Sequence, residues 1–342
     1  MDVSRFPLVP GSSPILVTHN KGMWFHTSDG RQILDAGGGA IVTNIGHGRQ
    51  EIARVAAEAL SQLDYVVPIF ATEARVALVE EVSDHWLPDP SWRCVFVSGG
   101  SESVDAAIRV AQLHHVASGR TERHKVIGRD VSYHGATMGA LAVGSHDRRR
   151  KGLEQLLPSM PKTSHYDPDQ LEKVIELEGA ETISAFIGEP VIGAAAGAYV
   201  PPDDYWTRIS EICAKHDILV IADEVMTGFG RLGTKMGHEA LGFTPDIIAA
   251  GKGLGGGYVP IGGVYCRPDV VEPIGKTDLA LMFYTFAGQD LCCSVAAKVL
   301  EIVRTENLLD RAAVMGEALR MRLEEEFRDH PNVEDIRGRG LL

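Results

Sequence analysis

The sequence has 342 residues, of which 44% are hydrophobic and 23% are charged. This composition is typical of a globular protein with a substantial core. At roughly 100–200 residues per domain, the length predicts two domains, or one large domain with an appendage. The net charge of −13 disfavours binding to phosphate backbones or anionic lipid, so neither nucleic acid nor a membrane surface is an expected partner.

No apolar run approaches the roughly 18–20 residues that span a bilayer. Residues 1–5 lack the basic start of a secretory signal, so none is expected. The odd number of cysteines and the absence of a Cys-x-x-Cys spacing disfavour a disulfide framework or a zinc site, so no metal is expected. These features predict a reducing, cytoplasmic location. The cysteines are Cys94, Cys213, Cys266, Cys292 and Cys293.

The first 45 residues are predicted to form short extended pieces joined by turns. Apolar runs occupy residues 15–17, 23–25 and 32–34, and the Asp29-Gly30 pair between the last two is a hairpin signal. From about residue 50, short β-branched runs alternate with segments of helical period. These runs cover residues 94–97, 125–128, 185–188, 218–222, 247–250 and 261–265.

Nearly unbroken apolar runs are typical of strands buried on both faces. Their alternation with helices predicts an α/β fold in which helices cover a largely parallel sheet. Residues 291–328 are predicted to form one or two long helices, and residues 332–342 resemble the beginning of a further strand.

Candidate ligand-binding residues follow three of the predicted strands, where open α/β sheets bind ligands. Gly99-Gly100-Ser101 enters a helix, which suits a phosphate, although a tight turn with Ser101 as N-cap explains it too. Asp223 would either face a cationic group or serve as an N-cap or structural ion pair. Lys252 is either a solvated charge or a partly desolvated amine that could form a Schiff base.

Together, these three features match the phosphate, the ring nitrogen and the aldehyde of pyridoxal phosphate. Tyr133, which follows the 125–128 run, adds an aromatic ring that could stack on a flat cofactor. Taken alone, Tyr133 would be interpreted as ordinary core packing.

The segment from Asp223 to Gly233, DEVMTGFGRLG, is followed by Pro245-Asp246-Ile247 and Gly251-Lys252. This combination resembles the class III pyridoxal-phosphate-dependent aminotransferases, the ω-transaminases and their relatives, and matching segments run from Trp24 to Leu341. The resemblance implies the aspartate-aminotransferase-like fold type I, with a mostly parallel large domain and a smaller α+β domain. It also implies a homodimer or tetramer with active sites at the subunit interface.

The resemblance further implies a role for each matching residue. Lys252 would hold the cofactor as a Schiff base and move a proton, and Asp223 would pair with the ring nitrogen. The other expected cofactor contacts are Gly99, Gly100 and Ser101 at the phosphate, Thr285 at the neighbouring subunit's phosphate, Tyr133, Val225 and Met226 at the ring, and the more distant His134 and Glu189. The expected substrate-pocket residues are Trp24, Ile41 and Tyr65.

Two positions bear on the substrate. Met226 stands where the ornithine and GABA branches of this family usually carry Gln, and an apolar residue there looks more like the amine:pyruvate branch. Residues 37–41, Gly-Gly-Gly-Ala-Ile, lie where relatives often carry bulkier side chains, which predicts a roomy substrate pocket.

The resemblance divides the chain into three parts. Residues 1–48 would be an N-terminal segment of the small domain, residues 49–290 the large domain, and residues 291–342 the start of the C-terminal small domain. Family members usually continue for roughly 80–110 residues beyond the matching position, about the size of a small domain, so a truncated chain is expected.

The expected function is transfer of an amino group from an ω-amino acid or amine to a keto acid such as pyruvate. The alternatives are an aminomutase or racemase of the same fold, a catalytically silent remnant, and a nucleotide-binding α/β protein.

Overall fold

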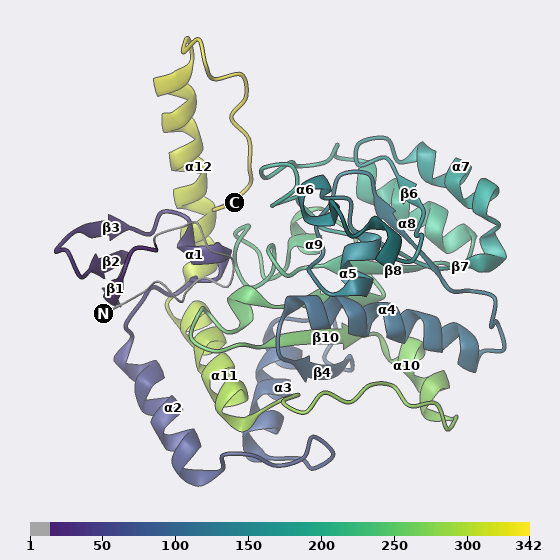
Figure 1. The fold of residues 1–342 in the computed structure, drawn as a ribbon, viewed down its shortest axis with the longest axis horizontal. Helices are drawn as coiled ribbons and strands as arrows, with labels where there is room; N and C mark the ends of the chain where they lie inside the picture. The colour runs from purple at the N-terminus through teal and green to yellow at the C-terminus, as the bar shows by residue number, and fades with distance from the viewer. Residues whose placement is uncertain (1–13) are drawn as a thin grey trace.

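A computed structural model describes residues 14–342, and a seven-stranded sheet lies at its centre (Figure 1). The strand order is β4-β10-β9-β8-β7-β5-β6. All neighbours pair in parallel except β10, which is antiparallel to both β4 and β9. The predicted largely parallel sheet is confirmed. The strands are β4 (Arg93–Val97), β5 (Lys125–Arg129), β6 (Lys162–Thr163), β7 (Ile183–Gly188), β8 (Leu219–Asp223), β9 (Ile247–Ala250) and β10 (Gly262–Cys266).

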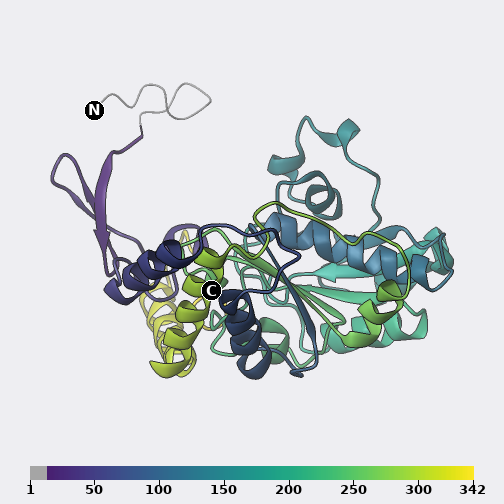
Figure 2. The same ribbon diagram turned by 90° about the horizontal axis from the view of Figure 1, so that it is seen from below.

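Both faces of this sheet are buried, which explains the unbroken apolar runs. Along β8, Leu219 and Ile221 face one core while Val220 and Ala222 face the other. Figure 2 shows α4 lying along one face of the sheet. The covering helices are α4 (Gly100–Ala117) and α10 (Pro268–Gly275) on the first face, and α7 (Asp169–Glu178), α8 (Tyr205–Lys215), α3 (Glu73–His85) and α11 (Asp290–Thr305) on the second.

A separate antiparallel sheet precedes the main fold and consists of β1 (Val17–Lys21), β2 (Trp24–Thr27) and β3 (Gln32–Leu34). The expected turn between β2 and β3 is confirmed, with Gly30 at a φ of 85°. Gly22, between β1 and β2, exchanges backbone hydrogen bonds of 2.8 and 3.0 Å with His47. These bonds connect the small sheet to the segment just before residue 50. In Figure 1 the small sheet lies beside the short helix α1 (Gly38–Ile41), away from the seven-stranded sheet.

The C-terminal region contains the two long helices that were expected, α11 and α12 (Leu308–Phe327). Asn307, in the left-handed conformation with a φ of 54°, separates them. The prediction of a strand within residues 332–342 is wrong. There the chain turns at residues 339–341, and the φ angles of Gly338 and Gly340, 146° and 58°, interrupt an extended strand.

The division into residues 1–48, 49–290 and 291–342 stays a prediction. Residues 1–13, which include the segment considered for a secretory signal, lie outside the described residues. Between residues 14 and 342, no helix is long and apolar enough to cross a membrane. The remaining elements are α1 (Gly38–Ile41), α2 (Gln50–Gln62), α5 (Met138–Val143), α6 (Asp147–Arg150), α9 (Gly237–Ala240) and the 3-10 turns η1 (Glu154–Leu156), η2 (Ala180–Thr182) and η3 (Lys252–Leu254).

Candidate active site

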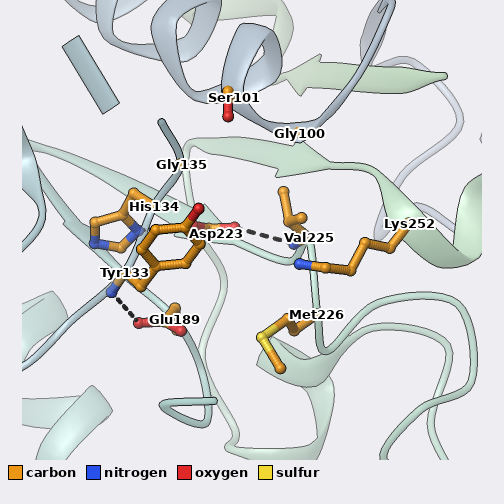
Figure 3. A pocket seen from close by; sticks show the side chains of 10 residues that line it. All are labelled: Gly100, Ser101, Tyr133, His134, Gly135, Glu189, Asp223, Val225, Met226 and Lys252. Atoms are coloured by element: carbon orange, nitrogen blue, oxygen red, sulfur yellow. Dashed lines mark hydrogen bonds and ion pairs between the residues drawn. The ribbon is translucent and has the colours of Figure 1, made fainter. Parts of the chain in front are cut away.

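The segments that follow five strands of the sheet, β4, β5, β7, β8 and β9, meet at one cavity of about 210 Å³ (Figure 3). Because these strands run the same way, their carboxyl ends share one edge, where an open α/β sheet binds ligands. The cavity is lined by Gly100, Ser101, Tyr133, His134, Gly135, Glu189, Asp223, Val225, Met226 and Lys252.

All but one of these lining residues were expected cofactor contacts. The exception is Gly135, whose signal was its place directly after Tyr133 and His134 in the chain. Five expected site residues are absent from the lining, although all lie in the described part of the chain. These are Gly99, Thr285, Trp24, Ile41 and Tyr65.

Lys252 is the only lysine among the residues that line this cavity. It opens η3 directly after β9, with a left-handed φ of 41° that is unusual for a residue with a side chain. Figure 3 shows its side chain reaching across the cavity towards the side that carries Tyr133 and His134. Burial lowers the pKa of Lys252, while the carboxylates of Asp223 and Glu189 act in the opposite direction. Lys252 is thus half-buried at the cavity rather than a fully solvated surface charge.

Asp223 is a buried carboxylate at the end of β8, and two donors hold it in place. His134 Nδ1 donates to Oδ2 over 2.6 Å, and the backbone N–H of Val225 donates to Oδ1 over 3.0 Å. The His134 side chain is fully buried, and its Nε2 has no partner among the described residues. A negative charge is thus fixed at the cavity wall by an imidazole that faces it with an N–H group.

Glu189 connects two loops at the cavity. One carboxylate oxygen accepts the backbone N–H of Tyr133 over 3.1 Å, and the other accepts that of Gly193 over 3.2 Å. Burial raises the pKa of Glu189, the charges of His134 and Arg129 lower it, and that of Asp223 raises it. Glu189, at the start of the loop after β7, is therefore hydrogen-bonded to the loop after β5 and holds the two loops together.

The N-terminus of α4 forms one end of the cavity. Gly99 is the N-cap, so the interpretation of Ser101 as the cap is wrong. The Ser101 hydroxyl instead accepts the N–H of Ala136 over 3.0 Å. A methyl group at Gly100 would lie 2.7 Å from Val225 Cγ1, so glycine is needed there for close approach. Free N–H groups at a helix N-terminus suit a phosphate.

Tyr133 is half-buried, with its ring at the cavity rather than in the core. Its ring centroid lies 5.7 Å from that of His146 in an edge-on arrangement, and the Arg149 guanidinium lies 6.0 Å away. In Figure 3, Tyr133 and Val225 approach the cavity from different elements. The explanation by core packing alone is thereby excluded.

The expected substrate-pocket residues lie elsewhere on this chain. Trp24 is on β2 and Tyr65 on the loop after α2, and both are exposed. Ile41 has a left-handed φ of 59°, a strained conformation for a β-branched side chain. Within one described chain, none of the three reaches the cavity, so their assignment to a substrate pocket stays a prediction.

The residues present fit pyridoxal phosphate on three observations. The N-terminus of α4 lines the cavity with Gly100 and Ser101, Asp223 offers a buried carboxylate, and Lys252 offers an amine. The cofactor needs an anion site, a partner for its ring nitrogen and a primary amine. The cavity provides all three.

Comparison with known proteins shows the family to which the chain belongs. Residues 9–342 match the class III aminotransferase family. The ω-aminotransferase of Caulobacter vibrioides is 32% identical over 100% of this chain and 83% of its own length. The putrescine–pyruvate aminotransferase of Pseudomonas aeruginosa is also 32% identical, over 96% of this chain and 75% of its own.

Solved structures point the same way. An (S)-enantioselective ω-transaminase from Thermomicrobium roseum superposes with a TM-score of 0.91 at 34% identity, covering 96% of this chain and 76% of its own. The ω-transaminase of Pseudomonas jessenii in complex with PMP superposes with a TM-score of 0.92 at 30% identity, covering 99% and 81%. The fold is therefore that of the fold type I pyridoxal-phosphate enzymes. The chain belongs to the class III aminotransferases, a pyridoxal-phosphate-dependent family.

Proposed function

We propose that this chain binds pyridoxal phosphate at Lys252 and transfers an amino group from an ω-amino acid or amine to a keto acid such as pyruvate. The observation that carries the proposal is one cavity that holds a desolvated lysine amine, a buried carboxylate and a helix N-terminus. The apolar Met226 at its wall, and the pyruvate in the name of the Pseudomonas aeruginosa relative, support the choice of acceptor.

Each residue would contribute a separate task. Bound pyridoxal phosphate supplies an aldehyde that reacts with amines and a ring that draws electrons from the substrate carbon. Gly100 and Ser101 would hold the phosphate, and Asp223 would keep a positive charge on the ring nitrogen, oriented by His134. Burial lowers the pKa of Lys252, so a larger share of its Nζ would be neutral than in a solvated lysine. The neutral amine would attack the aldehyde and later accept or return a proton.

Borohydride reduction tests the cofactor assignment. The chain, loaded with pyridoxal phosphate and reduced, should carry one stable adduct that peptide mapping places on Lys252. Lys252→Ala should lose it, whereas Lys298→Ala, which removes a lysine paired with Glu301 on α11, should keep it. An unchanged adduct in Lys252→Ala would refute the assignment.

A half-reaction separates the proposed activity from the alternatives. The loaded chain mixed with excess amine, without a keto acid, should convert its cofactor to the amine form in a single turnover. Pyruvate should then reverse this change and release alanine. Exchange of a substrate proton without that conversion would indicate a racemase or aminomutase, and an unchanged cofactor spectrum would indicate a silent remnant.

We also propose that two copies assemble through the surface formed by residues 65–70 and 283–286. Four of its apolar side chains are strongly exposed: Ile69, Phe70, Phe283 and Phe286. Arg75 joins the two segments, donating to Phe70 O and Gly288 O over 2.6 Å each. An exposed apolar patch of this kind is typical of a protein interface.

Thr285, which is exposed and lies in this surface, would then reach the partner's phosphate. Light scattering should find a dimer for the natural chain and monomer for Phe70→Glu. The matched control Leu177→Glu, at an exposed leucine on α7, should remain dimeric. Dimerisation that survives Phe70→Glu combined with Phe286→Glu would refute this interface.

A further inference from the structure

The side chain of Met226 lies directly on the backbone of Gly193. A methyl group built on Gly193 would lie 2.3 Å from Met226 Cε and 2.4 Å from Sδ, well inside van der Waals contact. Gly193 is buried and Met226 is 8% exposed, so the thioether fills the place that a side chain at position 193 would occupy. The two residues therefore compete for one volume.

This requirement for glycine is steric rather than conformational. Gly193 is not among the glycines with positive φ, so its backbone is one that alanine can adopt without strain. The three heavy atoms nearest to a methyl group added at position 193 all belong to the Met226 side chain. An alanine at position 193 would thus change the structure through Met226 alone.

Hydrogen bonds on both sides hold the backbone at Gly193 in place. Its N–H donates to Glu189 Oε1 over 3.2 Å, and its carbonyl accepts the N–H of Gly197 over 2.8 Å. Next to it, Ile192 and Tyr199 exchange two backbone hydrogen bonds of 2.9 Å. Any adjustment therefore falls to the flexible methionine side chain, whose unbranched chain readily changes rotamer.

The open space next to Met226 is the cavity that Lys252 enters. We propose that Gly193 is a positioning residue for this site: its missing side chain lets Met226 lie against the loop after β7 and leaves the cavity wide enough for the cofactor ring. The inference rests on the proposed function, because it assigns the space beside Lys252 to pyridoxal phosphate.

Cofactor titration of the apo protein tests the inference. Gly193→Ala should bind pyridoxal phosphate roughly tenfold more weakly, because overpacking forces the thioether into the cavity. Removing that thioether should relieve the effect, so Gly193→Ala combined with Met226→Ala should bind within about threefold of Met226→Ala alone. Gly275→Ala is the matched control, because Gly275 also lacks a positive φ and has nothing within 4 Å of its added methyl group.

A second readout needs no cofactor. In apo protein with labelled methionine methyl groups, the Met226 methyl resonance, identified through its loss in Met226→Ala, should shift in Gly193→Ala and stay in place in Gly275→Ala. Two results would overturn the inference. In the first, Gly193→Ala binds pyridoxal phosphate as tightly as the natural chain and leaves the Met226 resonance unshifted. In the second, the double variant binds the cofactor as weakly as Gly193→Ala, or folds no better than that variant. Failure of the natural chain to bind pyridoxal phosphate would instead refute the proposed function.

Discussion

Replacing Glu224 with glutamine should destabilise the fold, because it removes one buried oxygen that accepts hydrogen bonds. Glu224 is fully buried directly after Asp223, and its carboxylate accepts hydrogen bonds from the backbone N–H groups of Gly237 and His238 over 2.8 and 2.7 Å. His238 Nδ1, at 3.0 Å, and the Thr227 hydroxyl also donate to it. These bonds anchor the start of α9 to the end of β8.

Glutamine keeps the shape but replaces one oxygen with an NH₂ group, which cannot accept. The Thr227 hydroxyl can rotate and the His238 ring can change tautomer, whereas a backbone N–H can do neither. Either Gly237 or His238 therefore keeps a buried N–H without an acceptor. This unsatisfied N–H group, together with the loss of charge-assisted hydrogen bonds, should lower the free energy of unfolding by about 3 kcal/mol.

Calorimetry should detect this cost. At about 2.1 cal/mol/K per residue, the unfolding entropy of 342 residues is about 0.7 kcal/mol/K, so the melting temperature should fall by about 4 °C. Glu239→Gln is the matched control, because Glu239 is exposed on α9 and accepts only the Lys235 N–H, over 3.2 Å. It should change the melting temperature by less than about 1 °C. Equal melting temperatures for the two variants would refute the reasoning.

Three further predictions concern the cavity. Asp223→Asn, which removes the negative charge at its wall, should weaken pyridoxal phosphate binding by at least about tenfold in a titration of apo protein, and unchanged affinity would contradict the assigned role. Gly100→Ala, whose methyl group would lie 2.7 Å from Val225 Cγ1, should lower stability in calorimetry by about 1–3 kcal/mol, while Gly275→Ala should not. Because burial lowers the Lys252 pKa below its ordinary 10.5, the rate of imine formation with a probe aldehyde should reach half its maximum below pH 10.5, and a midpoint at or above that pH would contradict the burial argument. At a pH between the lowered pKa of the folded chain and the ordinary 10.5 of the unfolded chain, Lys252 binds a proton only when the chain is unfolded. In that range this lysine makes the stability of the fold rise with pH.

Local sequence information was sufficient for the strands and for the strand-end residues of the cavity, whereas Val225, Met226, His134 and Glu189 were expected only from the family resemblance. The apolar runs located β4, β5, β7, β8, β9 and β10, because a strand buried on both faces must be apolar throughout. The strand-end rule then brought Asp223 and Lys252 to one place. It could not find β6, whose two residues are too short for a pattern, or the antiparallel direction of β10, which depends on its partners.

The failures have similar physical causes. Residues 332–342 carry strand-like composition, but a strand needs a neighbour to pair with, and the φ angles of Gly338 and Gly340 interrupt the extended chain. Ser101 has the right residue type for an N-cap, but the cap is Gly99, two residues earlier, and the Ser101 hydroxyl accepts the N–H of Ala136 instead.

The sequence by itself determined the chemical groups of the candidate site: a lysine, a carboxylate and a glycine-rich helix start, each at or just beyond the end of a buried strand. Only the tertiary structure decided how they act together. The pairing of Asp223 with His134 spans 89 positions in the chain, and the contact between Gly193 and Met226 joins two loops. Hydrogen bonding and steric exclusion operate over a few ångströms, and folding alone sets which distant residues come within that range.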